Sequence, residues 1–128
     1  MNESDVLNML ERLGKAVSEG DLQTIAAAYA YPALFLSDEQ VISLEGPGQV
    51  EESFGNARNW YIDRGILTTR PELLNFDRIS DRVASVDVRW PGFDKNGSEN
   101  YTETSHYLIH EEGGKPLIRA AASRTIKN

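Results

Sequence analysis

The chain places its helix-forming sequence first and its strand-forming sequence last, and this order limits the folds that it can adopt. Apolar residues at helical spacing predict two short helices before Pro32 and a third near Gln49–Arg64. From Leu67 to Ile126 the sequence is an almost unbroken run of strand patterns. Helices followed by a long, mainly antiparallel sheet are typical of the α+β class. We therefore expect three N-terminal helices packed in a curved sheet that leaves an interior pocket at its open end.

Capping and breaking residues give approximate limits for the helical region. Gly20 stands where a left-handed residue is expected to end the first helix. Asp21 can cap a second helix, whose apolar face includes Tyr29 and which Pro32 is expected to end. A short strand over Ala33–Leu36 should follow.

Turn residues divide the second half of the chain into strands. Residues Ala84–Trp90 alternate apolar and polar side chains with a period of two, which predicts a half-buried strand. Asn96-Gly97 is a strong signal for a hairpin turn, and the strand Ser98–His110 is expected after it. A turn at Gly113-Gly114 then leads to a closing strand over Leu117–Ile126.

Length and charge exclude several classes of protein. With 128 residues, 40% of them hydrophobic, residues 1–128 fit one domain with its own core. The net charge is −7, and residues 1–63 hold 11 acidic but only 3 basic side chains. Because phosphate binding depends on clustered lysine and arginine, no nucleic-acid partner is expected. No apolar stretch approaches the ~20 residues that span a bilayer, so no membrane partner is expected. The acidic N-terminus lacks the pattern of a signal peptide, which predicts a cytoplasmic location.

Several short motifs occur in an order that is similar to a known family. They are Glu19-Gly20-Asp21-Leu22, Tyr29-Ala30-Tyr31-Pro32, Gly65 after the third helix, the Asp94–Gly97 hairpin, and the ending Tyr107…Gly113-Gly114…Ile118. In this order the sequence resembles the nuclear transport factor 2-like superfamily, which includes SnoaL-like and ketosteroid isomerase-like proteins. The resemblance covers essentially the whole chain. It implies a cystatin-like α+β cone and, commonly, a homodimer formed through the convex face of the sheet.

Aromatic side chains from both halves of the chain are candidates for the lining of a pocket. We predict that the pocket is formed by Tyr29, Tyr31, Phe35, Phe54, Trp60, Tyr61, Trp90, Tyr101, Tyr107, Ile118 and Ala120. Small Ala120 and Ala122 opposite large rings would leave room that a solid core would fill. Such a lining suits a small apolar or aromatic molecule, although each aromatic residue alone could equally be core. The sequence has no phosphate-binding glycine loop and no dinucleotide fingerprint, so no cofactor is expected.

Glu103 is the one candidate for a catalytic group. The alternation of its strand places it inside the cone, where a carboxyl group has a raised pKa and can exchange a proton near neutral pH. The alternative is a partly exposed sheet residue paired with an arginine. Asp38 falls close to the position of the proton-abstracting carboxylate that the resemblance to ketosteroid isomerase implies, but its surroundings predict an exposed turn.

Polar residues on the other side of the sheet indicate an outer face rather than a metal site. His106 and His110 lie four residues apart on a strand, which separates their Cα atoms by ~13 Å. Without cysteine or a carboxylate at ligand spacing, no metal is expected there. We expect this face, with Leu108 and Ala121 among pairable polar groups, to form the homodimer interface.

Three functions follow as alternatives. We favour a small-molecule-binding protein with an aromatic-lined apolar pocket and no established catalysis. The second is an isomerase-, cyclase- or dehydratase-like enzyme that uses Glu103, with Tyr101 or Tyr107 as hydrogen-bond donor. The third is a dimerisation or scaffold module whose cone is filled by its own side chains.

Overall fold

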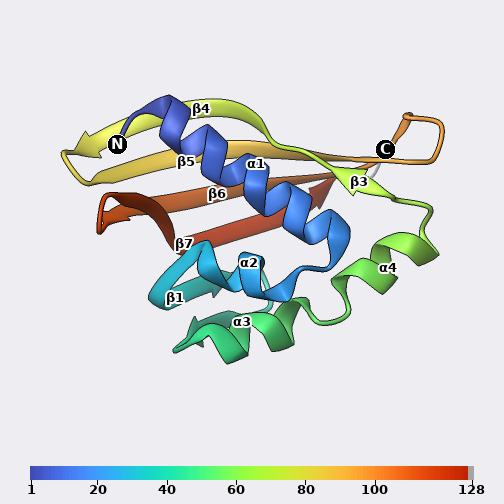
Figure 1. The fold of residues 1–128 in the computed structure, drawn as a ribbon, viewed down its shortest axis with the longest axis horizontal. Helices are drawn as coiled ribbons and strands as arrows, with labels where there is room; N and C mark the ends of the chain where they lie inside the picture. Colours follow the sequence, from blue (N-terminus) through green and yellow to red (C-terminus); the bar gives the residue numbers. More distant parts are fainter. Residues whose placement is uncertain (127–128) are drawn as a thin grey trace.

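The computed structural model describes the backbone of residues 1–126 and the side chains of residues 1–123. Its helices come first and pack against a curved, open sheet, so the predicted α+β fold is confirmed (Figure 1). The strand order is β2-β1-β7-β6-β5-β3, and β4 pairs with β5. The strands are β1 (Tyr29–Leu36), β2 (Val41–Leu44), β3 (Thr68–Thr69), β4 (Glu72–Ser80), β5 (Val83–Phe93), β6 (Glu99–Glu112) and β7 (Lys115–Ile126). Only β1 and β7 pair in parallel among the described strands, so the sheet is mixed.

Helix α1 (Glu3–Glu19) lies across the sheet and provides much of the core (Figure 1). The side chain of Asn2 accepts a hydrogen bond from the Asp5 backbone N–H, and the Asp5 carboxylate accepts one from the Asn2 backbone N–H, which completes a capping box. Gly20 ends the helix in the left-handed conformation, with a φ of 73°, as the sequence predicts. The apolar stripe of α1 packs in one core cluster with β5, whose alternate residues from Ala84 to Trp90 point inward and are buried.

The second helix is shorter than the sequence predicts. Helix α2 (Leu22–Ala27) ends before Tyr29, which instead begins β1. The backbone N–H of Ile118 on β7 donates to the carbonyl of Ala28, and Tyr29 pairs with Ile118. The prediction that Tyr29 is helical and that Pro32 ends the helix is therefore wrong, because pairing with a strand remote in sequence takes over this segment.

The predicted third helix is divided in two. Helices α3 (Pro47–Phe54) and α4 (Ala57–Asp63) are separated at Gly55 and Asn56, two residues with low helix propensity. The prediction of a single helix over this region is wrong in that detail. The division lets α3 pack on α2 while α4 lies farther along the chain toward β3 (Figure 1).

The pairing of β6 with β7 contains a register shift that decides which side of β7 faces inward. Ile109 pairs with Ile118, but the preceding residue, Leu108, pairs with Ala120, so Arg119 is an extra residue on β7. After the shift, Ala121 points inward and is only 3% exposed. The predictions that Ala120 faces inward and that Ala121 lies on the outer face are therefore both wrong. One extra residue reverses the alternation of the strand that follows it.

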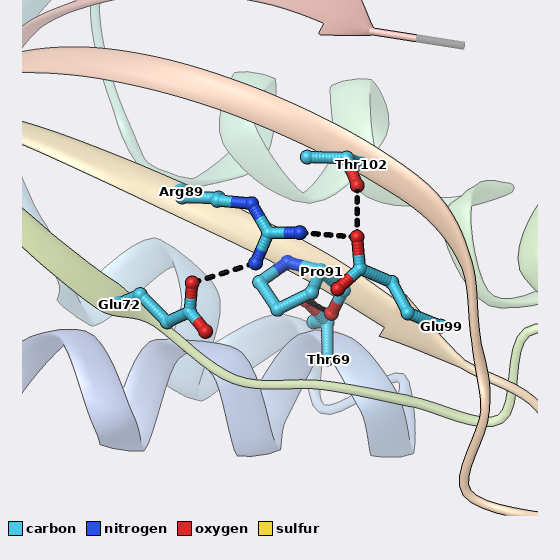
Figure 2. A network of polar contacts seen from close by, with 6 residues as sticks. All are labelled: Thr69, Glu72, Arg89, Pro91, Glu99 and Thr102. Atoms are coloured by element: carbon cyan, nitrogen blue, oxygen red, sulfur yellow. Dashed lines mark hydrogen bonds and ion pairs between the residues drawn. The ribbon is translucent and has the colours of Figure 1, made fainter. Parts of the chain in front are cut away.

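Ion pairs and hydrogen bonds tie neighbouring strands together on the outer face of the sheet. Figure 2 shows Arg89 of β5 between Glu72 of β4, at 2.6 Å, and Glu99 of β6. The hydroxyl of Thr102 donates to Glu99 at 2.6 Å (Figure 2). On the inner side, the hydroxyl of Thr69 on β3 donates to the carbonyl of Pro91 on β5 at 2.9 Å. The outward position that the alternation predicts for Arg89 is thus consistent with its partners. None of the described helices is long and apolar enough to cross a bilayer.

Candidate functional site

A cavity of about 80 Å³ lies between the helices and the inner face of the sheet. It is lined by Leu13, Val17, Tyr29, Phe35, Phe54, Tyr61, Thr69, Trp90, Glu103, Ser105, Tyr107, Ala121 and Ser123. The helical residues come from α1, α3 and α4, and the strand residues from β1, β3, β5, β6 and β7. The cavity therefore lies where the helical layer meets the curved sheet.

Seven of the predicted site residues lie around this cavity. They are Tyr29, Phe35, Phe54, Tyr61, Trp90, Glu103 and Tyr107. The sequence analysis did not name Leu13, Val17 or Thr69 as lining residues. Leu13 and Val17 could have been found from the apolar stripe of the first helix, whereas the two-residue strand that carries Thr69 has no pattern of its own.

Five predicted pocket residues lie elsewhere. Ile118 is fully buried in the core, and Ala120 lies on the other side of the register shift. Tyr31 does not line the cavity, and its hydroxyl donates to the carbonyl of Ala26 at 2.7 Å. Trp60 is 37% exposed, since α4 directs it outward, and the Arg64 guanidinium stacks 3.8 Å above its ring. Tyr101 stands beside the cavity rather than in its wall, where its hydroxyl reaches Glu103.

Aromatic rings from β1 and α3 form an apolar wall of the cavity. The rings of Tyr29 and Phe35 meet edge to face at 5.6 Å between centroids, and Phe35 meets Phe54 at 6.1 Å. Such edge contacts stabilise the pairs and hold the rings in fixed orientations. The ring contacts therefore give the wall a defined shape.

Glu103 is the only ionisable carboxyl group among the residues that line the cavity. Burial raises its pKa above the usual range of a glutamate. A hydrogen bond from the Tyr101 hydroxyl, at 3.3 Å, opposes part of that rise. The Tyr101 hydroxyl is the one hydrogen-bond partner of the Glu103 carboxyl group among the described residues.

The tyrosines around Glu103 differ in whether their hydroxyl groups have a hydrogen-bond partner. Trp90 Nε1 donates to the Tyr107 hydroxyl at 3.0 Å, and burial raises the pKa of Tyr107 to about 12. Burial also raises the pKa of Tyr29 and of Tyr61, and the negative charge of Glu103 adds to both rises. The hydroxyl groups of Tyr29 and Tyr61 have no hydrogen-bond partner among the described residues. Every fully buried side-chain nitrogen or oxygen of the described residues has a hydrogen-bond partner, so these two hydroxyls must be accessible to open space. Both residues line the cavity, which offers that space.

Two wider hollows share lining residues with the cavity. Their volumes are about 270 Å³ and 620 Å³, and both share Glu103 and Ser123 with the cavity. The larger hollow is also lined by Asp38 and Glu39 from the β1–β2 turn. Glu103 thus stands at the throat between the narrow cavity and the acidic mouth, and Asp38 is exposed in a turn, as its sequence surroundings predict.

The histidines pair with carboxylates on the outer face and form no metal site. His106 Nδ1 lies 2.7 Å from Asp87 Oδ1, and His110 Nδ1 lies 2.8 Å from Glu112 Oε2. Over the described part of the chain, no three histidine or carboxylate side chains lie close enough to hold a metal ion.

The chain matches a known protein family over nearly its whole length. The family described as NTF2-like protein (DUF6841) matches residues 3–125, which is nearly the whole chain. No curated protein sequence gives a significant match.

Solved structures that are similar to this chain share its fold at low sequence identity. A protein of unknown function from Shewanella oneidensis MR-1, described as NTF-2 like, is 18% identical, with a TM-score of 0.72 over 96% of this chain and 98% of its own. A domain of unknown function with a cystatin-like fold from Nostoc punctiforme is 13% identical, with a TM-score of 0.76 over 100% and 81%. A ketosteroid isomerase-like protein from Erwinia carotovora atroseptica is 12% identical, with a TM-score of 0.69 over 100% of both chains. At these identities the similarity shows the fold alone.

Proposed function

This chain belongs to the NTF2-like protein family DUF6841, and we propose that it binds a small, mostly apolar molecule in the cavity between its helices and its sheet. The observation that carries the proposal is the combination of an aromatic wall with hydroxyl groups that have no hydrogen-bond partner among the described residues. Tyr29 and Tyr61 direct unpaired hydroxyls toward open space in an otherwise apolar wall. A few polar groups at fixed places in an apolar cavity are typical of small-molecule sites.

The throat geometry supports entry from the open end of the sheet. The cavity of about 80 Å³ is too small for a ligand of drug size, but Glu103 and Ser123 line both it and the two larger hollows beside it. A ligand would place one small group in the cavity and the remainder in the mouth. Small residues at Ala121 and Ser123 leave this passage open.

Native mass spectrometry of the gently purified protein tests the proposal. The expected result is an intact mass in excess of the chain mass that disappears on denaturation. The matched variant Ala121→Leu, which fills the cavity, should lose that excess mass, whereas Ala120→Leu on the other side of β7 should keep it. Equal excess mass in both variants would place the bound molecule elsewhere, and no excess mass would favour a scaffold module with a self-filled cone.

A second candidate function is proton transfer by Glu103 in an isomerase-, cyclase- or dehydratase-like reaction. Its support is the buried carboxyl group at the throat, whose raised pKa brings it closer to neutral pH. Tyr101 would then position the carboxyl group through its hydroxyl. The substitution Glu103→Gln should abolish turnover of any substrate found, and unchanged turnover would refute this role.

We also propose that the chain forms a homodimer through the outer face of the sheet. Leu108 of β6 is 40% exposed on that face, among polar side chains such as Asp87 and His106 that can pair across an interface. Sedimentation velocity at micromolar concentration should give the mass of a dimer, and a monomer there would contradict the proposal.

A further inference from the structure

We propose that the ligand carries a positively charged amine or quaternary ammonium group, which binds at Glu103 in the throat of the cavity. This inference rests on the proposed function and adds the chemical class of the ligand. It is carried by the charges, the rings and the unpaired hydroxyls around the throat.

The charges around the throat have one sign. Glu103 lines the cavity and both hollows, and Asp38 and Glu39 line the larger hollow. No lysine, arginine or histidine is among the described residues that line these three spaces. The Glu103 carboxylate therefore has no cationic partner there from the described part of the protein. An ionised carboxylate in a partly apolar place is costly unless it is paired, so a cationic ligand would supply the missing charge.

The aromatic rings suit a cation better than they suit an anion. The faces of tyrosine, phenylalanine and tryptophan carry negative potential and attract ammonium groups by about 0.5–2 kcal/mol each. Tyr29, Phe35 and Phe54 contact one another in the cavity wall, and Trp90 and Tyr107 line the same cavity. A cationic group inside this wall would meet several rings at once, as in aromatic cages for quaternary ammonium ions.

An unpaired hydroxyl is an independent sign that a ligand belongs in this space. Tyr29 is only 4% exposed, yet its hydroxyl has no partner among the described residues. Since this hydroxyl reaches the open space of the cavity, a polar group of a ligand bound there can form a hydrogen bond with it. The Tyr29 oxygen can accept a hydrogen bond from an amine, or it can contact the polarised methyl groups of a quaternary ammonium ion.

Size and long-range charge agree with the same class of ligand. An apolar cavity of about 150 Å³ holds one benzene molecule, so a cavity of about 80 Å³ admits only a compact group such as a trimethylammonium head. The remainder of the ligand would lie in the mouth, beside Asp38 and Glu39. The net charge of −7 attracts cations toward this mouth and repels anions.

The test compares two probes of the same shape that differ in charge. Choline carries a trimethylammonium group, and 3,3-dimethylbutan-1-ol carries a neutral tert-butyl group in its place. Their dissociation constants are measured by titration calorimetry or NMR at neutral pH and low salt. The expected result is at least tenfold tighter binding of choline. Glu103→Gln should remove most of that preference, while the exposed control Glu52→Gln should keep it.

The outcomes separate this inference from the proposed function. Equal or tighter binding of the neutral alcohol would overturn the preference for a cation and leave a small-molecule site in place. A preference for choline that persists in Glu103→Gln would overturn the assignment to Glu103. Binding of neither probe would overturn both the inference and the proposed cavity site.

Discussion

A larger side chain on β7 should raise the free energy of unfolding if it fills the cavity, and should lower it if the core is already full. In Ala121→Leu, three carbon atoms are added to a side chain that points into the cavity and is 3% exposed. An unfilled cavity costs about 24 cal/mol per Å³, so about 80 Å³ corresponds to about 2 kcal/mol. Burying three further carbon atoms contributes a similar amount, at about 0.8 kcal/mol each. We therefore expect this variant to unfold with a free energy up to about 2 kcal/mol higher than that of the wild type, and to lose ligand binding.

The assay is equilibrium unfolding in urea, combined with titration of choline. The matched control is Ala120→Leu, which adds the same atoms one residue earlier, where the side chain faces away from the cavity. Because Ala120 is half-buried on the outer face, opposite Leu108, this control should gain no stability from cavity filling, and its choline binding should be unchanged.

Two results would refute this reasoning. A loss of about 1–3 kcal/mol in Ala121→Leu would show a core that is already full and becomes overpacked. Loss of binding in Ala120→Leu but not in Ala121→Leu would show that β7 lacks the register shift after Ile118. The pair of variants therefore tests both the cavity and the strand register that creates it.

Three further predictions concern the surroundings of the cavity. Burial raises the folded-state pKa of Glu103 above its unfolded value of about 4.3. The stability that its protonation contributes is therefore present below that pH and is lost as the pH rises through the folded-state pKa. Glu103→Gln should abolish this fall in the free energy of unfolding, and an unchanged pH profile would contradict the prediction. Trp90→Phe removes the donor to the Tyr107 hydroxyl and should cost about 1 kcal/mol or more in urea unfolding; an unaltered midpoint would show that this hydrogen bond contributes nothing. Gly92→Ala should cost about 1–3 kcal/mol, because the new Cβ would lie 2.9 Å from a methyl group of Ile66. Its control Gly48→Ala has open space in a helix and should gain up to about 1 kcal/mol, so a gain in both variants would exclude the crowding.

Much of the sheet could be predicted because its signals are local. The alternation from Ala84 to Trp90 fixes the inner face of β5, and the turn at Asn96-Gly97 forms as expected, with Gly97 at a φ of 77°. The inward positions of Glu103, Ser105 and Tyr107 on β6 follow from the same period of two, since β6 pairs with β5 in register over these residues.

The errors fall where segments distant in the sequence compete. Tyr29 belongs to β1 because its segment pairs with β7, which overrides a weak helical pattern. On β7, the extra residue Arg119 donates to Glu112 of β6 and to the carbonyl of Pro32 on β1. Glu112 is only seven residues from Arg119, but Pro32 is 87 residues away, so no local pattern could reveal the shift that turns Ala121 inward.

Local sequence patterns suffice to predict the class of fold, the order of helices and strands, and the placement of a carboxyl group inside the cone at Glu103. These features depend on periodicity and turn chemistry, which act between residues close together in the chain. Long-range contacts decide which aromatic residues line the cavity and that Ala121 rather than Ala120 faces it. They also leave the Tyr29 hydroxyl without a hydrogen-bond partner among the described residues. Those features depend on how β7 fits between β1 and β6, because a shift of one residue in strand register reverses the face of every side chain that follows it.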